Sequence, residues 1–149
     1  MSLKEKLQQD WKEALKTGDK FKANIISMAR AAVLQIEKTD GEKLDDSRVI
    51  DVLSKEIKQR REALVEFEKG NRQDLVDKAN KEIEILMSYL PQQLTEDEIK
   101  SIISDAVKEI GANSMKDMGK VMKSVTPKTK GRADGSLVSK LVKEFLNNK

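Results

Sequence analysis

The chain has 149 residues, of which 37% are charged and only 3% are aromatic. Cysteine and histidine are both absent, which excludes disulfide and thiolate chemistry and removes the usual general base near neutral pH and the commonest zinc ligand. No apolar run approaches the roughly 20 residues of a membrane span, and the segment from Met1 to Lys20 has no signal-peptide core. We therefore expect a soluble, cytoplasmic protein with no cofactor, no bound metal and no membrane contact.

Four consecutive segments before Pro91 have apolar residues at helical spacing. Capping residues and glycines separate these segments, and Lys and Glu on the remaining faces favour helices. The first helix is expected to start at Ser2 and stop at Thr17-Gly18, and the second to start at Asp19 and stop at Thr39 to Gly41. The third is expected to start at Asp45 to Ser47 and stop at Gly70, and the fourth to start at Asn71 and stop at Pro91. Four such helices can share one core, so we predict an N-terminal helical bundle domain over residues 1–91.

A second group of helices follows the Leu90-Pro91 boundary, where proline disfavours helical geometry at the preceding residue. Thr95 and Glu98 form a capping-box pattern that opens a helix ending at Gly111. A short methionine-rich helix then runs from Ser114 to Pro127, which is expected to end it, and a last helix follows an Asp134 cap. These patterns predict an all-α protein whose second, small domain has three helices and covers residues 95–149.

Charge is distributed unevenly along the chain. Residues 1–112 contain 20 Lys and Arg against 23 Asp and Glu, a net charge of −3, whereas residues 113–149 contain 9 against 3, a net charge of +6. Basic residues near Arg60 alternate with Glu56 and Glu62, so pairing along a solvated helix face is expected there. The basic end of the chain is instead typical of contact with nucleic acid or an acidic surface, although a merely solvated lysine-rich face is the simpler alternative.

The candidate binding residues lie between Asp117 and Gly135. Three lysines face away from the apolar side of the short helix, and three further cations surround a glycine just before the next helix start, whose N–H groups favour anions. An ordinary surface helix and an exposed turn would show the same pattern. The nucleic-acid-binding candidates are Lys116, Lys120, Lys123, Lys128, Lys130, Gly131 and Arg132.

The segment MGKVMK, the later KGRADG and the linker YLPQQL together resemble the GatB/YqeY family. The resemblance covers nearly the whole chain, at the size of a stand-alone YqeY-like protein. It implies an all-helical protein of two domains, the second similar to the tail domain of the GatB subunit of aspartyl/glutamyl-tRNA amidotransferase. In that enzyme the tail contacts tRNA, whereas the carbon–nitrogen ligase chemistry belongs to other parts.

Catalytic residues are not identified in the sequence. Gly119-Lys120 lacks the glycine spacing and the hydroxyl residue of a phosphate-binding P-loop. Asp45-Asp46 and the acidic run Glu96 to Glu98 lie at helix starts, where carboxylates complement the helix dipole. We therefore do not expect a stand-alone enzyme, and carbon–nitrogen ligase activity with glutamine as the amide donor is a distant third possibility that rests on family association alone.

Two functions from different classes remain open. One is an accessory module that binds tRNA through the basic carboxyl-terminal loop and helix face and presents it to an aminoacyl-tRNA synthetase or an amidotransferase. The low aromatic content favours recognition of RNA backbone and shape over stacking on bases. The alternative is a protein–protein interaction module without RNA binding, which would use the amphipathic helices or the methionine-rich face.

Overall fold

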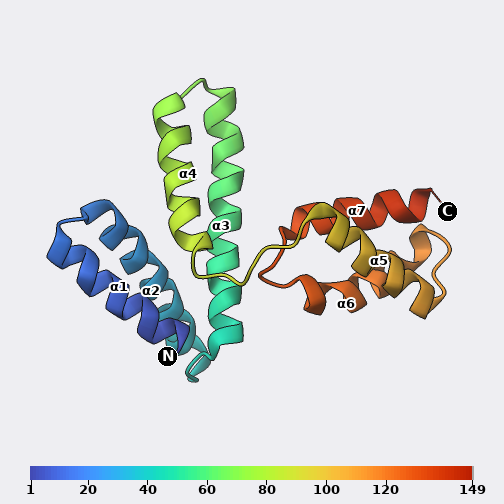
Figure 1. Ribbon diagram of the computed structural model, residues 1–149, viewed down its shortest axis with the longest axis horizontal. Coiled ribbons are helices and arrows are strands. Elements are labelled where there is room, and N and C mark those ends of the chain that lie inside the picture. Colours follow the sequence, from blue (N-terminus) through green and yellow to red (C-terminus); the bar gives the residue numbers. More distant parts are fainter. Residues whose placement is uncertain (149) are drawn as a thin grey trace. The chain divides into compact units, whose positions relative to one another are not determined.

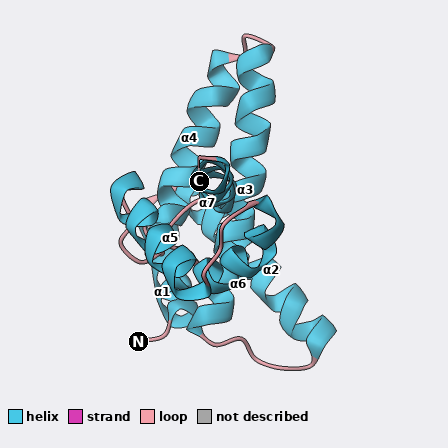
Figure 2. Ribbon diagram, turned by 90° about the vertical axis from the view of Figure 1, so that its right-hand side faces the viewer, coloured by secondary structure: helices cyan, strands magenta, loops and turns pink. Residues whose placement is uncertain are grey.

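The computed structural model describes residues 1–148, and all regular structure in this range is helical, which confirms the all-α prediction (Figures 1 and 2). None of these helices is long and apolar enough to span a membrane. In chain order they are α1 (Leu3–Thr17), α2 (Lys20–Asp40), α3 (Asp46–Lys69), α4 (Gln73–Met87), α5 (Glu96–Ile110), the short 3-10 helix η1 (Met115–Asp117), α6 (Met118–Thr129) and α7 (Gly135–Asn147).

Most helices start where the capping residues in the sequence predict. The side chains of Ser2, Asp19, Asp45 and Thr95 each accept a hydrogen bond from a backbone N–H in the first turn of the following helix. At Thr95 the capping box is complete, because the Glu98 carboxylate also accepts from the Thr95 N–H at 3.1 Å. Local sequence therefore decides these boundaries.

The start of α4 differs from the prediction. Asn71 has a left-handed φ of 55°, so it cannot begin the helix and belongs to the turn. Arg72 follows as the N-cap residue without a side-chain cap, and its guanidinium instead pairs with Asp74 at 3.0 Å. The helix consequently begins two residues later than expected, at Gln73.

Pro127 does not end α6, contrary to the prediction; the helix continues through it to Thr129. Proline removes one backbone donor, but this loss falls in the last turn, where few further helical hydrogen bonds depend on it. Two threonine hydroxyls add bonds on either side of the proline, Thr126 to the Met122 carbonyl at 2.6 Å and Thr129 to the Val125 carbonyl at 3.1 Å. These contacts support the final turn.

The chain separates into two compact units, residues 1–90 and the segment from Pro91 onward, each with its own core. In the first unit, α1 pairs with α2 and α3 pairs with α4, and Figure 1 shows the two hairpins joined near the start of α3 and diverging from there. Its buried apolar cluster draws on all four helices and comprises Leu7, Ile25, Ile26, Ala29, Val33, Leu44, Val49, Val52, Leu53, Ile57, Leu86 and Tyr89.

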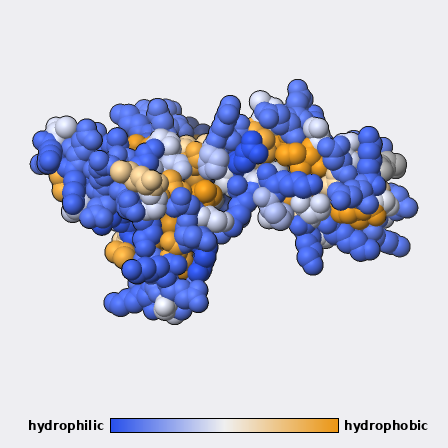
Figure 3. Space-filling model, turned by 60° about the horizontal axis from the view of Figure 1, so that its bottom comes forward, coloured by the Kyte–Doolittle hydropathy of each residue, from blue (hydrophilic) through white to orange (hydrophobic). Residues whose placement is uncertain are grey.

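The second unit is built from α5, α6 and α7 around a smaller apolar cluster. Met118 and Met122 pack against this cluster, so these methionines fill the core, whereas Met115 is exposed. On the face drawn in Figure 3, hydrophilic side chains cover most of the surface and apolar patches lie between them. The buried members are Ile99, Ile103, Ala106, Val107, Ala112, Val121, Val125, Val138, Leu141, Val142 and Leu146.

Candidate nucleic-acid interface in the carboxyl-terminal unit

Three of the candidate lysines share one exposed side of η1 and α6, which we call the lysine face: Lys116, Lys120 and Lys123. Val121 and Val125, on the opposite side of α6, are fully buried against α5 and α7. Because these apolar residues fix the rotation of α6, Lys120 and Lys123 point to solvent, and Lys116 on η1 is exposed as well. The structure thus places this side of α6 as the spacing predicted.

The lysine face has no acidic partner. None of its three ammonium groups forms an ion pair within residues 1–148, and Lys128 at the end of α6 likewise forms none. Asp117, which directly follows Lys116, forms no ion pair with these lysines; its carboxylate accepts from the Asn113 backbone N–H at 3.1 Å. These ammonium groups are therefore exposed without a salt bridge in the described part of the chain and can approach an anion in solution.

The glycine-bearing loop between α6 and α7 is held by the linker that precedes α5. The Gln93 side-chain amide donates to the Gly131 carbonyl at 2.8 Å, and the Leu94 backbone N–H donates to the Arg132 carbonyl at 2.7 Å. Gly131 is buried and has a φ of 72°, a conformation that residues with a Cβ rarely adopt. The loop is therefore a fixed turn, with Lys128 and Lys130 exposed on either side of the buried Thr129.

Arg132 is half-buried and turned toward the linker. Its Nε donates to the Gln92 carbonyl at 3.3 Å. The pKa of Glu98 lies below its ordinary value chiefly because that carboxylate accepts hydrogen bonds from Thr95, and the charge of Arg132 lowers it further. The guanidinium thus helps to fix the loop. A phosphate could bind only those guanidinium N–H groups that do not take part in this contact.

The start of α7 does not offer the open anion site that the sequence suggested. Asp134 is the N-cap, and its carboxylate accepts from the Ser136 backbone N–H at 3.1 Å. A phosphate would have to displace this carboxylate from the helix terminus. Any binding by this region must therefore depend on lysine and arginine side chains more than on helix-start N–H groups.

Sequence reasoning missed residues of two kinds. Gln93 belongs to the linker motif, but its contact with a loop 38 residues away leaves no local signal in the sequence. Lys140 and Lys143 are not among the predicted residues, although both are exposed on α7 and the apolar stripe of that helix identifies its solvent side. They extend the set of exposed cations of this unit to a second helix.

The described residues offer no metal site: among residues 1–148, no three Asp or Glu side chains gather where they could hold an ion. The acidic run Glu96 to Glu98 occupies the first turn of α5 and complements its dipole, as expected.

Comparison with known proteins gives a consistent result over nearly the whole chain. A family model described as "Yqey-like protein" matches residues 4–146. The protein named "Altered inheritance of mitochondria protein 41, mitochondrial" from Pyrenophora tritici-repentis is 30% identical over 147 residues, which cover 97% of this chain and 81% of that protein. Its namesake from Lachancea thermotolerans is also 30% identical, over 93% of this chain and 79% of its own length.

These names place the relatives in mitochondria, so the cytoplasmic location expected from the sequence is contradicted. That expectation rested on the lack of cysteine and of a signal-peptide core in the first 20 residues. Both features bear on export into oxidising surroundings, and neither discriminates among the remaining compartments.

Proposed function

This chain belongs to the family of YqeY-like proteins, and from that premise we propose that it is an accessory module that binds tRNA. The observation that supports the proposal most directly is the lysine face, whose three ammonium groups have no carboxylate partner within residues 1–148. Lys128, Lys140 and Lys143 add exposed positive charge on α6 and α7. An RNA backbone, with one negative charge per nucleotide, complements such a surface.

The mode of binding follows from the residues present. Lysines contact phosphates as point charges and do not read bases, and this unit has one aromatic residue, the half-buried Phe145, on which a base could stack. We therefore propose recognition of the backbone and shape of a folded RNA. The resemblance to the tail of the GatB subunit supports tRNA as that RNA, and an aminoacyl-tRNA synthetase or an amidotransferase as the enzyme to which it is presented.

The test is a fluorescence anisotropy titration of labelled, unfractionated tRNA with the full chain. Replacing Lys116, Lys120 and Lys123 together by Gln should weaken binding by about tenfold or more, because three phosphate contacts are lost. The slope of log affinity against log salt should become shallower by up to about three, since each phosphate contact contributes about one.

A matched control removes the same charge from the other unit. Lys12, Lys16 and Lys20 are exposed on α1 and α2 and are replaced by Gln in the same way. The control should retain the affinity of the unaltered protein. Equal weakening in both variants would show that the effect comes from net charge alone and not from the lysine face. A lack of tRNA binding at low salt would eliminate the proposal.

A protein–protein interaction module remains the second candidate, and a specific observation favours it. Leu15, Met28 and Leu34 in the first unit are each more than half exposed and present apolar area that a partner protein could cover. The methionine-rich face does not add to this surface, because Met118 and Met122 are used in the core. Co-purification of one stoichiometric protein, with no nucleic acid absorbance, would favour this candidate over tRNA binding.

A further inference from the structure

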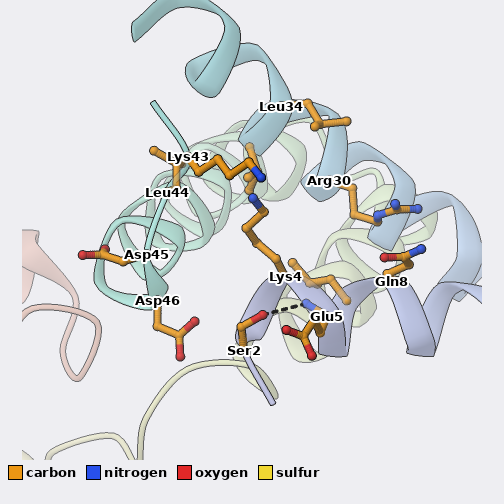
Figure 4. A pocket seen from close by; sticks show the side chains of 12 residues that line it. Ser2, Lys4, Glu5, Gln8, Arg30, Leu34, Lys43, Leu44, Asp45 and Asp46 are labelled. Carbon is orange, nitrogen blue, oxygen red and sulfur yellow. Dashed lines mark hydrogen bonds between the residues drawn. The ribbon is translucent and has the colours of Figure 1, made fainter. Parts of the chain in front are cut away.

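The first unit contains a pocket of about 800 Å³ that the proposed tRNA interface does not use. It lies where the first turns of α1, the carboxyl-terminal half of α2 and the connection from α2 to α3 meet (Figure 4). Its volume is within the range of sites that hold small organic ligands. All of its lining residues belong to residues 2–46, so the site is complete within one unit.

Apolar side chains form the floor and one wall of the pocket. Leu7, Val33 and Leu44 line it from the edge of the core and are at most 5% exposed, while Leu34 stands on α2 beside them with 57% of its surface exposed. Core residues supply a fixed apolar floor, and Leu34 supplies apolar area that is still in contact with water. The pocket therefore favours a ligand with an apolar body.

Positive charge gathers at one end of the pocket. The side chains of Lys4 and Lys43 extend from opposite sides and point their ammonium groups toward each other (Figure 4). Lys4 Nζ lies 2.6 Å from the Glu37 carboxylate, which also accepts from the Leu44 backbone N–H at 2.7 Å. The pKa of Glu37 is held below its ordinary value, first by the hydrogen bond from Lys4, then by that from Leu44, and also by the charge of Lys43. Across the whole lining, the cations Lys4, Arg30 and Lys43 are matched in number by the acids Glu5, Asp45 and Asp46, so an anion is favoured by the placement of two ammonium groups at one end and not by a net positive charge.

The two aspartates on the rim are already engaged by backbone donors. Asp45 accepts from the Arg48 N–H at 2.9 Å and Asp46 accepts from the Leu3 N–H at 3.0 Å, both at helix starts, where the dipole offsets a negative charge. Arg30 lines the pocket as a third cation, with its guanidinium 5.0 Å from the ring centre of Trp11. Glu5 is the only other acid that lines the pocket, and its side chain is exposed to solvent.

We propose that this pocket binds a free single-chain amphiphile with an anionic head, that is, a fatty acid. The hydrocarbon chain would lie against Leu7, Val33, Leu34 and Leu44, and the carboxylate would accept hydrogen bonds from Lys43 and from the donors that Lys4 does not give to Glu37. This site is independent of the lysine face, so the failure of one proposal leaves the other standing.

The test uses Trp11, the only tryptophan in the chain, as a reporter through its contact with Arg30. Dodecanoate is titrated into the full-length protein below the concentration at which it forms micelles. We expect a saturable change in Trp11 fluorescence with one ligand per chain, and shifts of the Leu7 and Val33 methyl signals in NMR spectra. Dodecyltrimethylammonium, with the same chain and the opposite charge, should bind at least tenfold more weakly.

Two variants and two matched controls locate the site. Lys43→Gln should weaken dodecanoate binding by about tenfold, and Leu34→Asp should abolish it, because a carboxylate would stand where the chain is expected. Lys38→Gln and Leu15→Asp make the same changes at exposed residues outside the pocket and should leave binding unchanged. The four positions are exposed, so each variant is expected to fold.

The proposal is overturned by any of four results: no saturation with dodecanoate, equal binding of the cationic amphiphile, equal effects in the control variants, or binding to anionic phospholipid vesicles without binding of free dodecanoate. The last result would identify a membrane surface as the source of the anionic lipid.

Discussion

The two units of this protein use charged residues in different ways. In the first unit, ion pairs link helices: Arg60 on α3 contacts Glu82 on α4 at 3.2 Å, and Lys4 on α1 contacts Glu37 on α2 at 2.6 Å. In the second unit, the lysine face of η1 and α6 has no such partner within residues 1–148. Charge thus contributes to packing in one unit, whereas in the other it is left to solvent, where it can act on a polyanion.

The same comparison applies to the cores. Both units bury a continuous apolar cluster, but the second draws it from only three short helices. A small core has less stability in reserve, so the loss of one buried side chain should matter more there. Three substitutions test how far this contrast extends.

The largest effect is expected in the core of the second unit. Ile103 on α5 has no exposed surface, so Ile103→Ala should lower the free energy of unfolding by about 2 to 5 kcal/mol through lost burial and a residual cavity. Urea denaturation followed by far-UV circular dichroism measures this loss. Ile102→Ala, at a partly buried neighbour, should cost clearly less. A loss below about 1 kcal/mol for Ile103→Ala would mean that this core can relax around the gap.

An intermediate effect is expected at the end of the first unit. Tyr89 is buried, and its hydroxyl donates to the Asp10 carboxylate on α1 at 2.6 Å. Tyr89→Phe leaves that carboxylate without its donor and should cost about 1.5 to 3 kcal/mol, the range for a hydrogen bond to a charged group. Denaturation in urea, followed by Trp11 fluorescence at neutral pH, gives the value. A cost near zero would show that water replaces the tyrosine hydroxyl.

The same substitution has a pH signature. Burial, and then the hydrogen bond to Asp10, raise the pKa of Tyr89 above its ordinary value, so the folded protein keeps the phenolic proton after the unfolded chain has lost it. The contribution of Tyr89 is therefore fully present below about pH 10 and is lost as the pH rises above that value. The stability difference between the unaltered protein and Tyr89→Phe should be constant up to about pH 9 and shrink as the pH is raised through about 10 to 11. A constant difference over this range would contradict the shift.

The smallest effect is expected at the basic loop. Gln93→Ala removes the side-chain hydrogen bond to the Gly131 carbonyl and should cost about 1 kcal/mol. Amide hydrogen exchange should become faster at Leu94, Arg132 and Ala133, whose N–H groups bond within or to this loop. Gln92→Ala is the matched control, because Gln92 contributes its backbone carbonyl to the contact with Arg132. Unchanged exchange in Gln93→Ala would show that the backbone contacts alone hold the loop.

Much of the fold was predictable because its determinants are local. The caps at Ser2, Asp19, Asp45 and Thr95 and the apolar stripes at helical spacing act within a few residues of one another. The same holds for the outward orientation of the lysine face, since the buried Val121 and Val125 fix the rotation of α6. The prediction that Pro127 ends α6 is wrong, because a proline in the last turn removes only one backbone donor and the helix can continue past it.

Arg60 shows where local reasoning ends. Its pairing with Glu56, four residues earlier, followed from helical spacing, and the structure confirms it at 2.8 Å. The predicted solvated position is wrong, because only 11% of the Arg60 side chain is exposed and its guanidinium also forms an ion pair with Glu82 on α4. Gln93 and the fatty-acid pocket likewise depend on segments that are distant in sequence.

The sequence by itself therefore determined the helices, most of their boundaries and the surplus of positive charge near the carboxyl end, since these depend on neighbours along the chain. Only the tertiary structure decided that Arg132 and Asp134 are engaged within the protein, that Gly131 is fixed by Gln93, and that Lys4 and Lys43 meet at one pocket. The physical reason is that a side chain takes whichever partner the packed helices bring within reach, and that choice is made in space.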